Sequence, residues 1–249
     1  MSIPLSVYRK LPKRFPHSLG FSKYCMEFDS SLFQYIDFGN VLNMGTVDFV
    51  LEAWFKTTST GTTRSMVRKR DIGAVAGYEL GITNTDEIYC FIHDGTNSAG
   101  AYDGLGIYND GEWHHVVALV DRDNVISLYI DGGFVATSPA IGGIGNLDNA
   151  VILSVGSRVG AASFWDGYID EVKIYRGTTM TPSEIRYNRL NYHTPIKNGL
   201  QLWVRMEEGA GLTAYDLSGN NYDGTLNPGA NPPTWTKVKK WELRAESEL

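Results

Sequence analysis

The sequence predicts an all-β protein, an antiparallel sandwich of two sheets. Ile126, Leu128 and Ile130 alternate with polar residues, which is the period-two pattern of a strand with one buried face. Asp131-Gly132 follows directly and is typical of a tight hairpin turn with positive φ. The chain has 249 residues, 27 glycines and only 20% charged residues, a composition that favours one large sandwich with many turns.

Short apolar segments bounded by Gly, Asp, Asn or Thr recur along the chain and predict its strands in order. The expected strands are 24–28, 35–38, 49–56, 65–69, 78–82, 87–93, 114–121, 125–130, 151–155 and 167–175. One short helix is expected after the last of them. Thr181 can cap it, Pro182 suits its first position, and Glu184 completes a capping box.

We divide the chain into an arm (1–19), a core (20–190) and a closing segment (191–249). Residues 1–26 contain five basic residues and no acidic one, although the net charge of the chain is −6. Four of the basic residues lie in the arm: Arg9, Lys10, Lys13 and Arg14. We interpret them either as an assembly arm that docks on an acidic partner or neighbouring subunit, or as a solvated tail.

Two motifs in the core resemble a known family. Trp113-His-His-Val precedes Leu128-Tyr-Ile-Asp-Gly132, and Phe164 to Tyr175 reads Phe-Trp-Asp-Gly-Tyr-Ile-Asp-Glu-Val-Lys-Ile-Tyr. This order resembles the laminin-G-like, or concanavalin-A-like, jelly-roll family over roughly residues 20–190. The resemblance implies a jelly roll with a short helix after the late strand, and a lectin-like role in recognition.

The closing segment is similar to what usually opens such a domain. Its strand-like residues 199–204 are expected to complete the sandwich within the same chain, because an unpaired apolar strand would leave an exposed sheet edge. Pairing with a neighbouring copy is the alternative.

The sequence favours a protein without catalytic residues. Retaining glycosidases on this scaffold place their catalytic carboxylates along one strand, in a Glu-x-Asp-x-(x)-Glu pattern. Here Glu27 and Asp29 are not followed by a glutamate two or three residues on, and Asp170 and Glu171 should point to opposite faces. Glycoside hydrolysis is therefore a remote alternative.

Calcium is the cofactor that the resemblance implies, with Asp29 and Asp170 as its ligands. The other interpretation is that both carboxylates cap turns. The chain also departs from the family, because Phe33-Gln34 stands where relatives carry two aspartates.

Carbohydrate binding needs exposed aromatic faces beside amide or carboxylate groups. The segment 94–109 offers such groups and is interpreted as a binding loop, with Trp165 as a second candidate. The candidate ligand-binding residues are Asp94, Asn97, Tyr102, Asp103, Tyr108 and Trp165.

The expected function is that of a virion decoration or appendage subunit, or of a surface adhesin, on the outside of a particle or cell, reached after synthesis in the cytoplasm. The beginning of the chain lacks an apolar secretory segment, no stretch is apolar enough to insert in a membrane, and Cys25 and Cys90 are expected to be buried free thiols. The expected partners are carbohydrate and protein neighbours, and nucleic acid is not expected. The alternative function is a structural assembly subunit without a ligand.

Overall fold

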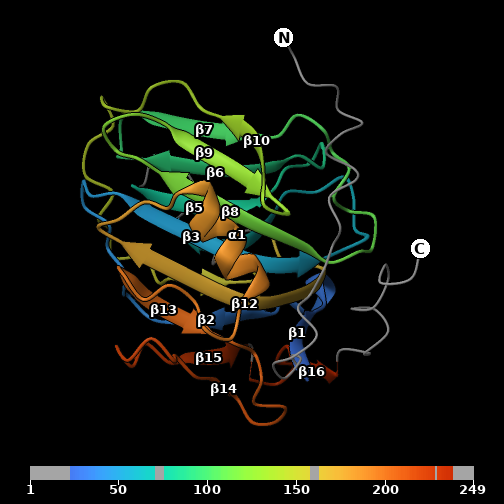
Figure 1. Cartoon of the computed structure of the whole chain (residues 1–249). Coiled ribbons are helices and arrows are strands. Elements are labelled where there is room, and N and C mark those ends of the chain that lie inside the picture. Colours follow the sequence, from blue (N-terminus) through green and yellow to red (C-terminus); the bar gives the residue numbers. More distant parts are fainter. Residues whose placement is uncertain (1–22, 71–75, 158–162, 228, 238–249) are drawn as a thin grey trace.

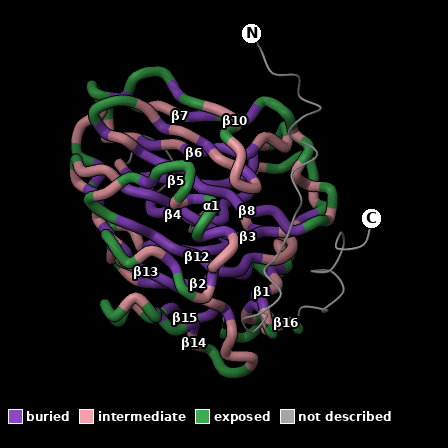
Figure 2. The backbone as a smooth tube through the Cα atoms, viewed as in Figure 1, coloured by how far each residue is buried: buried purple, intermediate pink, exposed green. Residues whose placement is uncertain are grey.

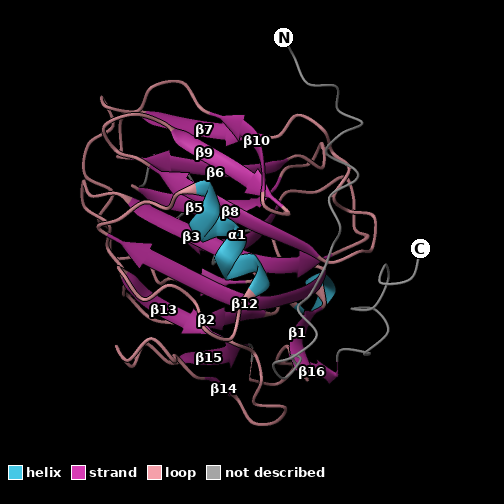
Figure 3. Cartoon of the chain, in the orientation of Figure 1, coloured by secondary structure: helices cyan, strands magenta, loops and turns pink. Residues whose placement is uncertain are grey.

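The computed structural model describes residues 23–70, 76–157, 163–227 and 229–237. These residues form two eight-stranded antiparallel sheets packed as a sandwich, with one α-helix and one 3₁₀ helix (Figures 1 and 3). The predicted jelly-roll sandwich with a short helix after the late strand is confirmed.

We call the two layers sheet A and sheet B. Sheet A has the order β10 (Gly133–Thr137), β9 (Ile126–Ile130), β8 (His114–Val120), β3 (Phe49–Lys56), β12 (Gly167–Arg176), β1 (Tyr24–Phe28) and β16 (Thr234–Lys237), and β13 (Leu200–Val204) also pairs with β12. Sheet B has the order β14 (Thr213–Ala214), β15 (Gly224–Asn227), β2 (Tyr35–Asp37), β11 (Ser154–Val155), β4 (Arg64–Lys69), β5 (Gly77–Ile82), β6 (Ile88–His93) and β7 (Ser98–Tyr102).

The hydrophobic core lies between the two sheets and takes alternate residues from each strand. Figure 2 shows buried residues concentrated in the central strands, with exposed residues mostly in the connecting loops. The predicted turn after β9 is confirmed, because Asp131 and Gly132 have φ values of 52° and 81°. The strands β7, β10, β14, β15 and β16 were not predicted, and the predicted strand 151–155 shortens to two residues.

Helix α1 (Pro182–Leu190) begins at the predicted capping box of Thr181 and Glu184, which is confirmed. Figure 1 shows α1 lying across the outer face of sheet A, over β3, β8 and β12. The other helix, η2 (Ser30–Leu32), connects β1 to β2 at one end of the sandwich.

Two strands, β1 and β13, pair with the same edge of β12 at different positions along it. Its first residues pair with β1, and residues 172–175 pair with β13. The changeover coincides with a register shift, at which Glu171 has a φ of 49°. Residues 200–237 thus supply strands to both sheets of the same chain.

The two cysteines are free and buried, as predicted. Among the described residues, no helix is long and apolar enough to cross a membrane.

Candidate functional site

An aromatic strip runs along the outer face of sheet B. Strand β6 places Ile88, Cys90 and Ile92 in the core, each fully buried. The intervening residues therefore point away from the core, because successive side chains of a strand alternate between its faces. The strip consists of three outward-facing residues of β6, Tyr89, Phe91 and His93, and of Tyr102 on the neighbouring strand β7.

Tyr102 is the exposed ring of a stacked pair. It lies opposite Tyr89 on the neighbouring strand, with ring centroids 5.9 Å apart and planes at 14°. Tyr89 is buried, whereas Tyr102 is 44% exposed. Gly100 makes this arrangement possible, because a Cβ there would lie 2.7 Å from the Tyr102 ring. One aromatic face is thus presented to solvent at the edge of the sheet.

Charged groups support the middle of the strip. The Arg70 guanidinium lies 4.7 Å from the centroid of the Phe91 ring. Beneath it, the Glu79 carboxylate accepts hydrogen bonds from Ser65 Oγ and from Arg68 Nη1, the latter at 2.5 Å, and lies 3.5 Å from Arg70 Nη1.

The Tyr89 hydroxyl belongs to the same polar group. Burial, together with the Glu79 carboxylate, raises the pKa of Tyr89 well above its usual value, so this hydroxyl stays protonated. The strip therefore combines aromatic surface with fixed hydrogen-bonding groups.

His93 forms the far end of the strip. Its ring lies 6.4 Å from that of Phe91, at 27°. Its Nδ1 accepts a hydrogen bond from the Gly95 backbone N–H at 2.7 Å, which leaves the proton of the neutral ring on Nε2. Tyr89 and His93 are four residues apart, so the strip extends for about 13 Å at ~3.3 Å per residue.

The predicted loop 94–109 is a turn, a strand and a second loop. Asp94 and Asn97 lie in the turn between β6 and β7, whereas Asp103 and Tyr108 follow the opposite end of β7. The structure therefore does not bring the six predicted residues into one loop site. Tyr102 alone among them belongs to the strip.

Two predicted carboxylates have local roles. Asp94 accepts hydrogen bonds from the backbone of Thr96, Asn97 and Gly145, and these bonds hold its pKa well below the usual range. Asp103 is buried and its Oδ1 accepts from the Ile88 N–H at 2.8 Å. Burial raises the pKa of Asp103 to about 6.

The remaining two aromatic candidates pack inward. Tyr108 contacts the ring of His114 edge-on, with centroids 5.0 Å apart. Trp165 is fully buried and packs against Phe55, so the prediction that it stacks on a sugar is wrong in this structure. Its place immediately before β12 turns the indole into the core.

The two predicted calcium ligands do not converge. Asp29 caps η2, where its Oδ1 accepts from the N–H and hydroxyl of Ser31. Asp170 is buried on the outer face of sheet A, and its Oδ1 accepts from the Glu171 N–H. Since Met26 pairs with Ile169, the two aspartates are several residues apart along the paired strands. In the described part of the chain, no three His, Cys, Asp or Glu residues group closely enough to hold a metal, so these residues do not fit a calcium site.

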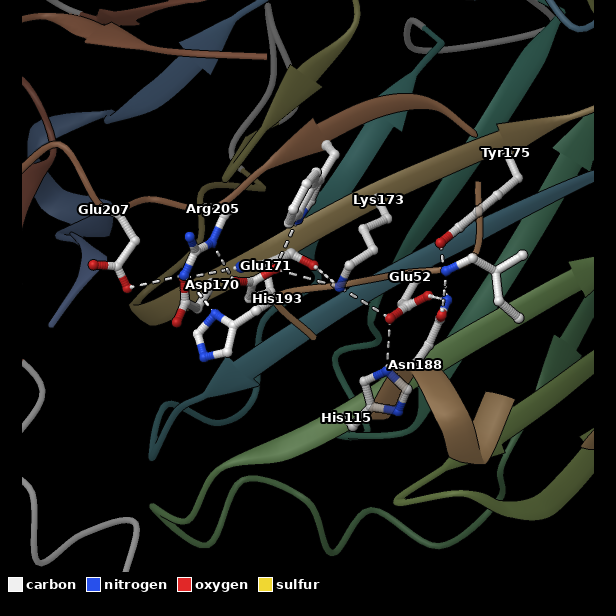
Figure 4. A network of polar contacts seen from close by, with 12 residues as sticks. Glu52, His115, Asp170, Glu171, Lys173, Tyr175, Asn188, His193, Arg205 and Glu207 are labelled. Atoms are coloured by element: carbon white, nitrogen blue, oxygen red, sulfur yellow. Dashed lines mark hydrogen bonds and ion pairs between the residues drawn. The ribbon is translucent and has the colours of Figure 1, made fainter. Parts of the chain in front are cut away.

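The sequence did not predict a buried charge cluster beneath α1, which we define as Glu52, His115, Glu171, Lys173 and Asn188 (Figure 4). Lys173 Nζ lies 3.1 Å from Glu52 Oε1 and 3.4 Å from Glu171 Oε2. His115 Nε2 and Asn188 Nδ2 also bond to Glu52, at 3.1 and 2.8 Å. All five side chains are at most 1% exposed.

Electrostatics in this cluster suit a structural role. Burial alone would raise the pKa of Glu52, but the Lys173 ammonium and the bonds from His115 and Asn188 lower it to about 2. Glu52 and Glu171 are a close carboxylate pair with an ammonium group between them and no solvent access. This pair therefore lacks the accessible acid that glycoside hydrolysis requires.

The assembly residues Arg9, Lys10, Lys13 and Arg14 lie outside the described residues. The sequence did not predict Tyr89, Phe91 and His93 as site residues, because 87–93 was interpreted only as a strand. The alternation of Tyr89, Phe91 and His93 was the available signal. A row of three aromatic residues on the face of a strand that points away from the core indicates a binding surface.

Comparison with known proteins supports the architecture. The sequence model of the concanavalin A-like lectin/glucanases superfamily matches residues 29–186. A candidate carbohydrate-binding protein from Bacteroides ovatus ATCC 8483 is similar in structure, with a TM-score of 0.67, 16% identity, and coverage of 87% of this chain and 60% of that protein. This chain thus spans about 60% of the length of the Bacteroides protein.

A heptameric SAP-like pentraxin from Limulus polyphemus has a TM-score of 0.51 and 11% identity, over 69% of this chain and 84% of the pentraxin. The binding domain of Paraclostridial Mosquitocidal Protein 1 also has a TM-score of 0.51, with 16% identity over 60% of this chain and 38% of that one. These likenesses concern the fold. No curated protein matches the chain in sequence.

Proposed function

Because the chain belongs to the concanavalin A-like lectin/glucanases superfamily, we propose that it is a non-catalytic carbohydrate-binding module whose sugar site is the aromatic strip. The observation that carries the proposal is the exposed ring of Tyr102, held flat on Tyr89 at the edge of sheet B. A rigid aromatic face of this kind suits stacking on the C–H groups of a sugar ring.

The polar groups of the strip complement the aromatic surface. His93 carries a donor on Nε2, because its Nδ1 accepts from Gly95, and Arg70 brings guanidinium donors beside Phe91. An apolar surface with a few placed donors is the usual composition of a small-molecule site. The likeness to the Bacteroides ovatus candidate carbohydrate-binding protein supports the same ligand class.

The absence of catalysis is part of the proposal. None of the four residues of the strip is a carboxylate, and the Glu79 carboxylate beside it is engaged by two arginine side chains. A glycosidase needs two carboxyl groups on either side of the scissile bond. This composition supports binding without hydrolysis.

The test begins with a screen of the full chain against soluble polysaccharides and a glycan array. Affinity for the best ligand is then measured by calorimetry for Tyr102→Ala, Tyr102→Phe and Phe134→Ala. Losing one aromatic contact costs about 0.5–1.5 kcal/mol, so Tyr102→Ala should bind roughly 2- to 12-fold more weakly. Tyr102→Phe should keep most of the affinity.

Phe134 is the matched control, since it is a 47% exposed aromatic residue on the other sheet. Its replacement should leave affinity unchanged. Equal binding by wild type and Tyr102→Ala would remove the strip as the site, and failure to bind any glycan would count against the proposed ligand class.

The proposed setting is the outside of a virion, another particle or a cell, because a carbohydrate-binding module acts where glycans are displayed. Sedimentation of the native protein on a density gradient tests it. Movement with a large particle supports a surface component, and a free protein at the top of the gradient argues against one.

A further inference from the structure

A second surface, at one end of sheet A, is separate from the aromatic strip. It is an open cleft of about 410 Å³ where the ends of β1, β3 and β12 meet η2. We call it the end cleft. The residues that matter here are Glu27, Asp29, Leu32, Lys56, Asp166 and Tyr168, all of which line it.

The end cleft is acidic and its acidic groups are held in place. Three carboxylates line it, against one ammonium group, that of Lys56. Glu27 accepts hydrogen bonds from Tyr168 Oη at 3.0 Å and Thr236 Oγ1 at 2.5 Å. Hydrogen bonds from Ser31 lower the pKa of Asp29, so its carboxylate is charged at neutral pH.

An aromatic pair, which we call the aromatic lip, is close in sequence to residues that line the end cleft. Phe33 stands between the lining residues Leu32 and Gln34, is 61% exposed, and contacts Phe164 edge-on with ring centroids 5.2 Å apart. Its φ of 57° is rare for a bulky residue. The chain thus adopts an uncommon backbone conformation at a ring that stays in solvent. Aromatic side chains are enriched at protein interfaces relative to the rest of the surface.

The chain itself contains a segment of complementary chemistry. Residues 1–26 contain five basic residues and no acidic one, and Leu5, Leu11 and Phe15 lie among them. Basic groups suit the three carboxylates, while apolar side chains suit the aromatic lip and the neighbouring Leu32.

The position of β1 favours an arm from another molecule. The arm joins β1 at its beginning, where the Lys23 N–H donates to both oxygens of Glu207 at 2.9 and 3.1 Å. The end cleft lies at the other end of this five-residue strand, about 13 Å away at ~3.3 Å per residue. A chain's own arm would have to reverse and run back along β1, whereas the arm of a second copy has no such constraint.

We propose that the end cleft is the docking site for the basic arm, residues 1–19, of a second copy of this chain. The proposal is independent of carbohydrate binding. It makes self-association electrostatic, and therefore weaker at high salt.

Complementation between two full-length variants tests it. The arm variant carries Arg9→Glu, Lys10→Glu, Lys13→Glu and Arg14→Glu. The cleft variant carries Thr58→Lys and Asp166→Lys, two lining residues whose side chains neither cap a helix nor belong to the core. The control variant, Asp123→Lys with Thr179→Lys, makes the same charge change beyond the opposite end of sheet A.

Association is measured by analytical ultracentrifugation at low salt, with thermal melting as the check on folding. Wild type and the control variant should self-associate, and each of the other two variants alone should do so at least tenfold more weakly. An equimolar mixture of the arm and cleft variants should recover association, because an intact arm then meets an intact cleft.

Recovery on mixing requires both variants to be folded, so loss of structure cannot imitate it. A wild type that remains monomeric at about 100 µM in about 50 mM salt, where screening is weak, would overturn the proposal. So would undiminished association of either variant, or a mixture that stays monomeric.

Discussion

Replacing Lys173 with methionine should destabilise the sandwich strongly. Lys173 lies between Glu52 and Glu171, at 3.1 and 3.4 Å, and all three side chains are at most 1% exposed. Methionine keeps the length of the side chain and removes the ammonium group. Two buried carboxylates then face each other without a cation between them.

The magnitude follows from Glu52. Its pKa falls from an ordinary 4.5 to about 2 in the folded protein. At ~1.4 kcal/mol per pKa unit, this shift corresponds to roughly 3 kcal/mol that favours the charged form. Removing one partner of a buried ion pair costs about 3–5 kcal/mol, which agrees with this figure. We therefore expect Lys173→Met to lower the free energy of unfolding by about 3–5 kcal/mol at pH 7.

The pH dependence has a definite sign. In wild type, the ionised Glu52 contributes its full stabilisation of the folded state above pH 4.5, because its pKa is lowered on folding. This stabilisation is lost only as the pH falls toward 2. In the variant, burial is no longer outweighed by Lys173, so the pKa of Glu52 should rise above its ordinary value. The variant should therefore recover part of its deficit as the pH falls from about 7 to about 5.

Urea unfolding of both proteins at the two pH values measures this difference. Lys237→Met is the control, because Lys237 is exposed on the edge strand β16. A loss below about 1 kcal/mol for Lys173→Met, the median value of an exposed pair, would refute the reasoning. A deficit that grows on acidification would refute the assignment to Glu52.

Three further results are expected. Burial raises the pKa of Asp103 to about 6, so the free energy of unfolding should decline as the pH rises through about 4 to 6. In urea unfolding, Asp103→Asn should remove this decline. A wild-type free energy of unfolding that is constant over this range would contradict the prediction. Gly156→Ala should lower the free energy of unfolding by more than about 2 kcal/mol, because its Cβ would lie 2.3 Å from the Phe28 ring. Gly219→Ala is the control, since Gly219 also has a positive φ but a Cβ there meets nothing within 4 Å. Equal losses for the two variants would argue against this contact. Calcium and a chelator should leave the melting temperature equal, because the described residues include no group of three His, Cys, Asp or Glu side chains that could hold a metal. A higher melting temperature with calcium would contradict this.

Local patterns predicted much of the fold. The alternation through Ile126, Leu128 and Ile130 identified β9, and Asp131-Gly132 identified its turn. Thr181 identified the beginning of α1. Each signal needs only neighbouring residues, because strand periodicity, turn conformation and helix capping are local properties.

Features that depend on distant residues were not predicted. Strand β7 reads Ser-Ala-Gly-Ala-Tyr, without the β-branched residues that mark a strand, and its pairing with β6 separates Asp94 from Asp103. Lys173 and Glu52 are 121 positions apart, so nothing near either residue indicated their contact. Burial of Trp165 likewise depends on Phe55, which belongs to another strand.

The position of β1 has a consequence for how the protein is made. Strand β1 lies between β12 and β16, so β1 leaves the ribosome well before its partner, residues 234–237, has been made. A nascent chain that ended at Leu190 would already hold β1, β2 and β12, yet the partners β13, β15 and β16 would be missing from their edges. Those edges resemble the exposed templates on which other chains add strands. Synthesis therefore passes through a period of aggregation risk that ends only when residues 200–237 have emerged, and a stop codon after α1 should yield an insoluble product instead of a smaller sandwich.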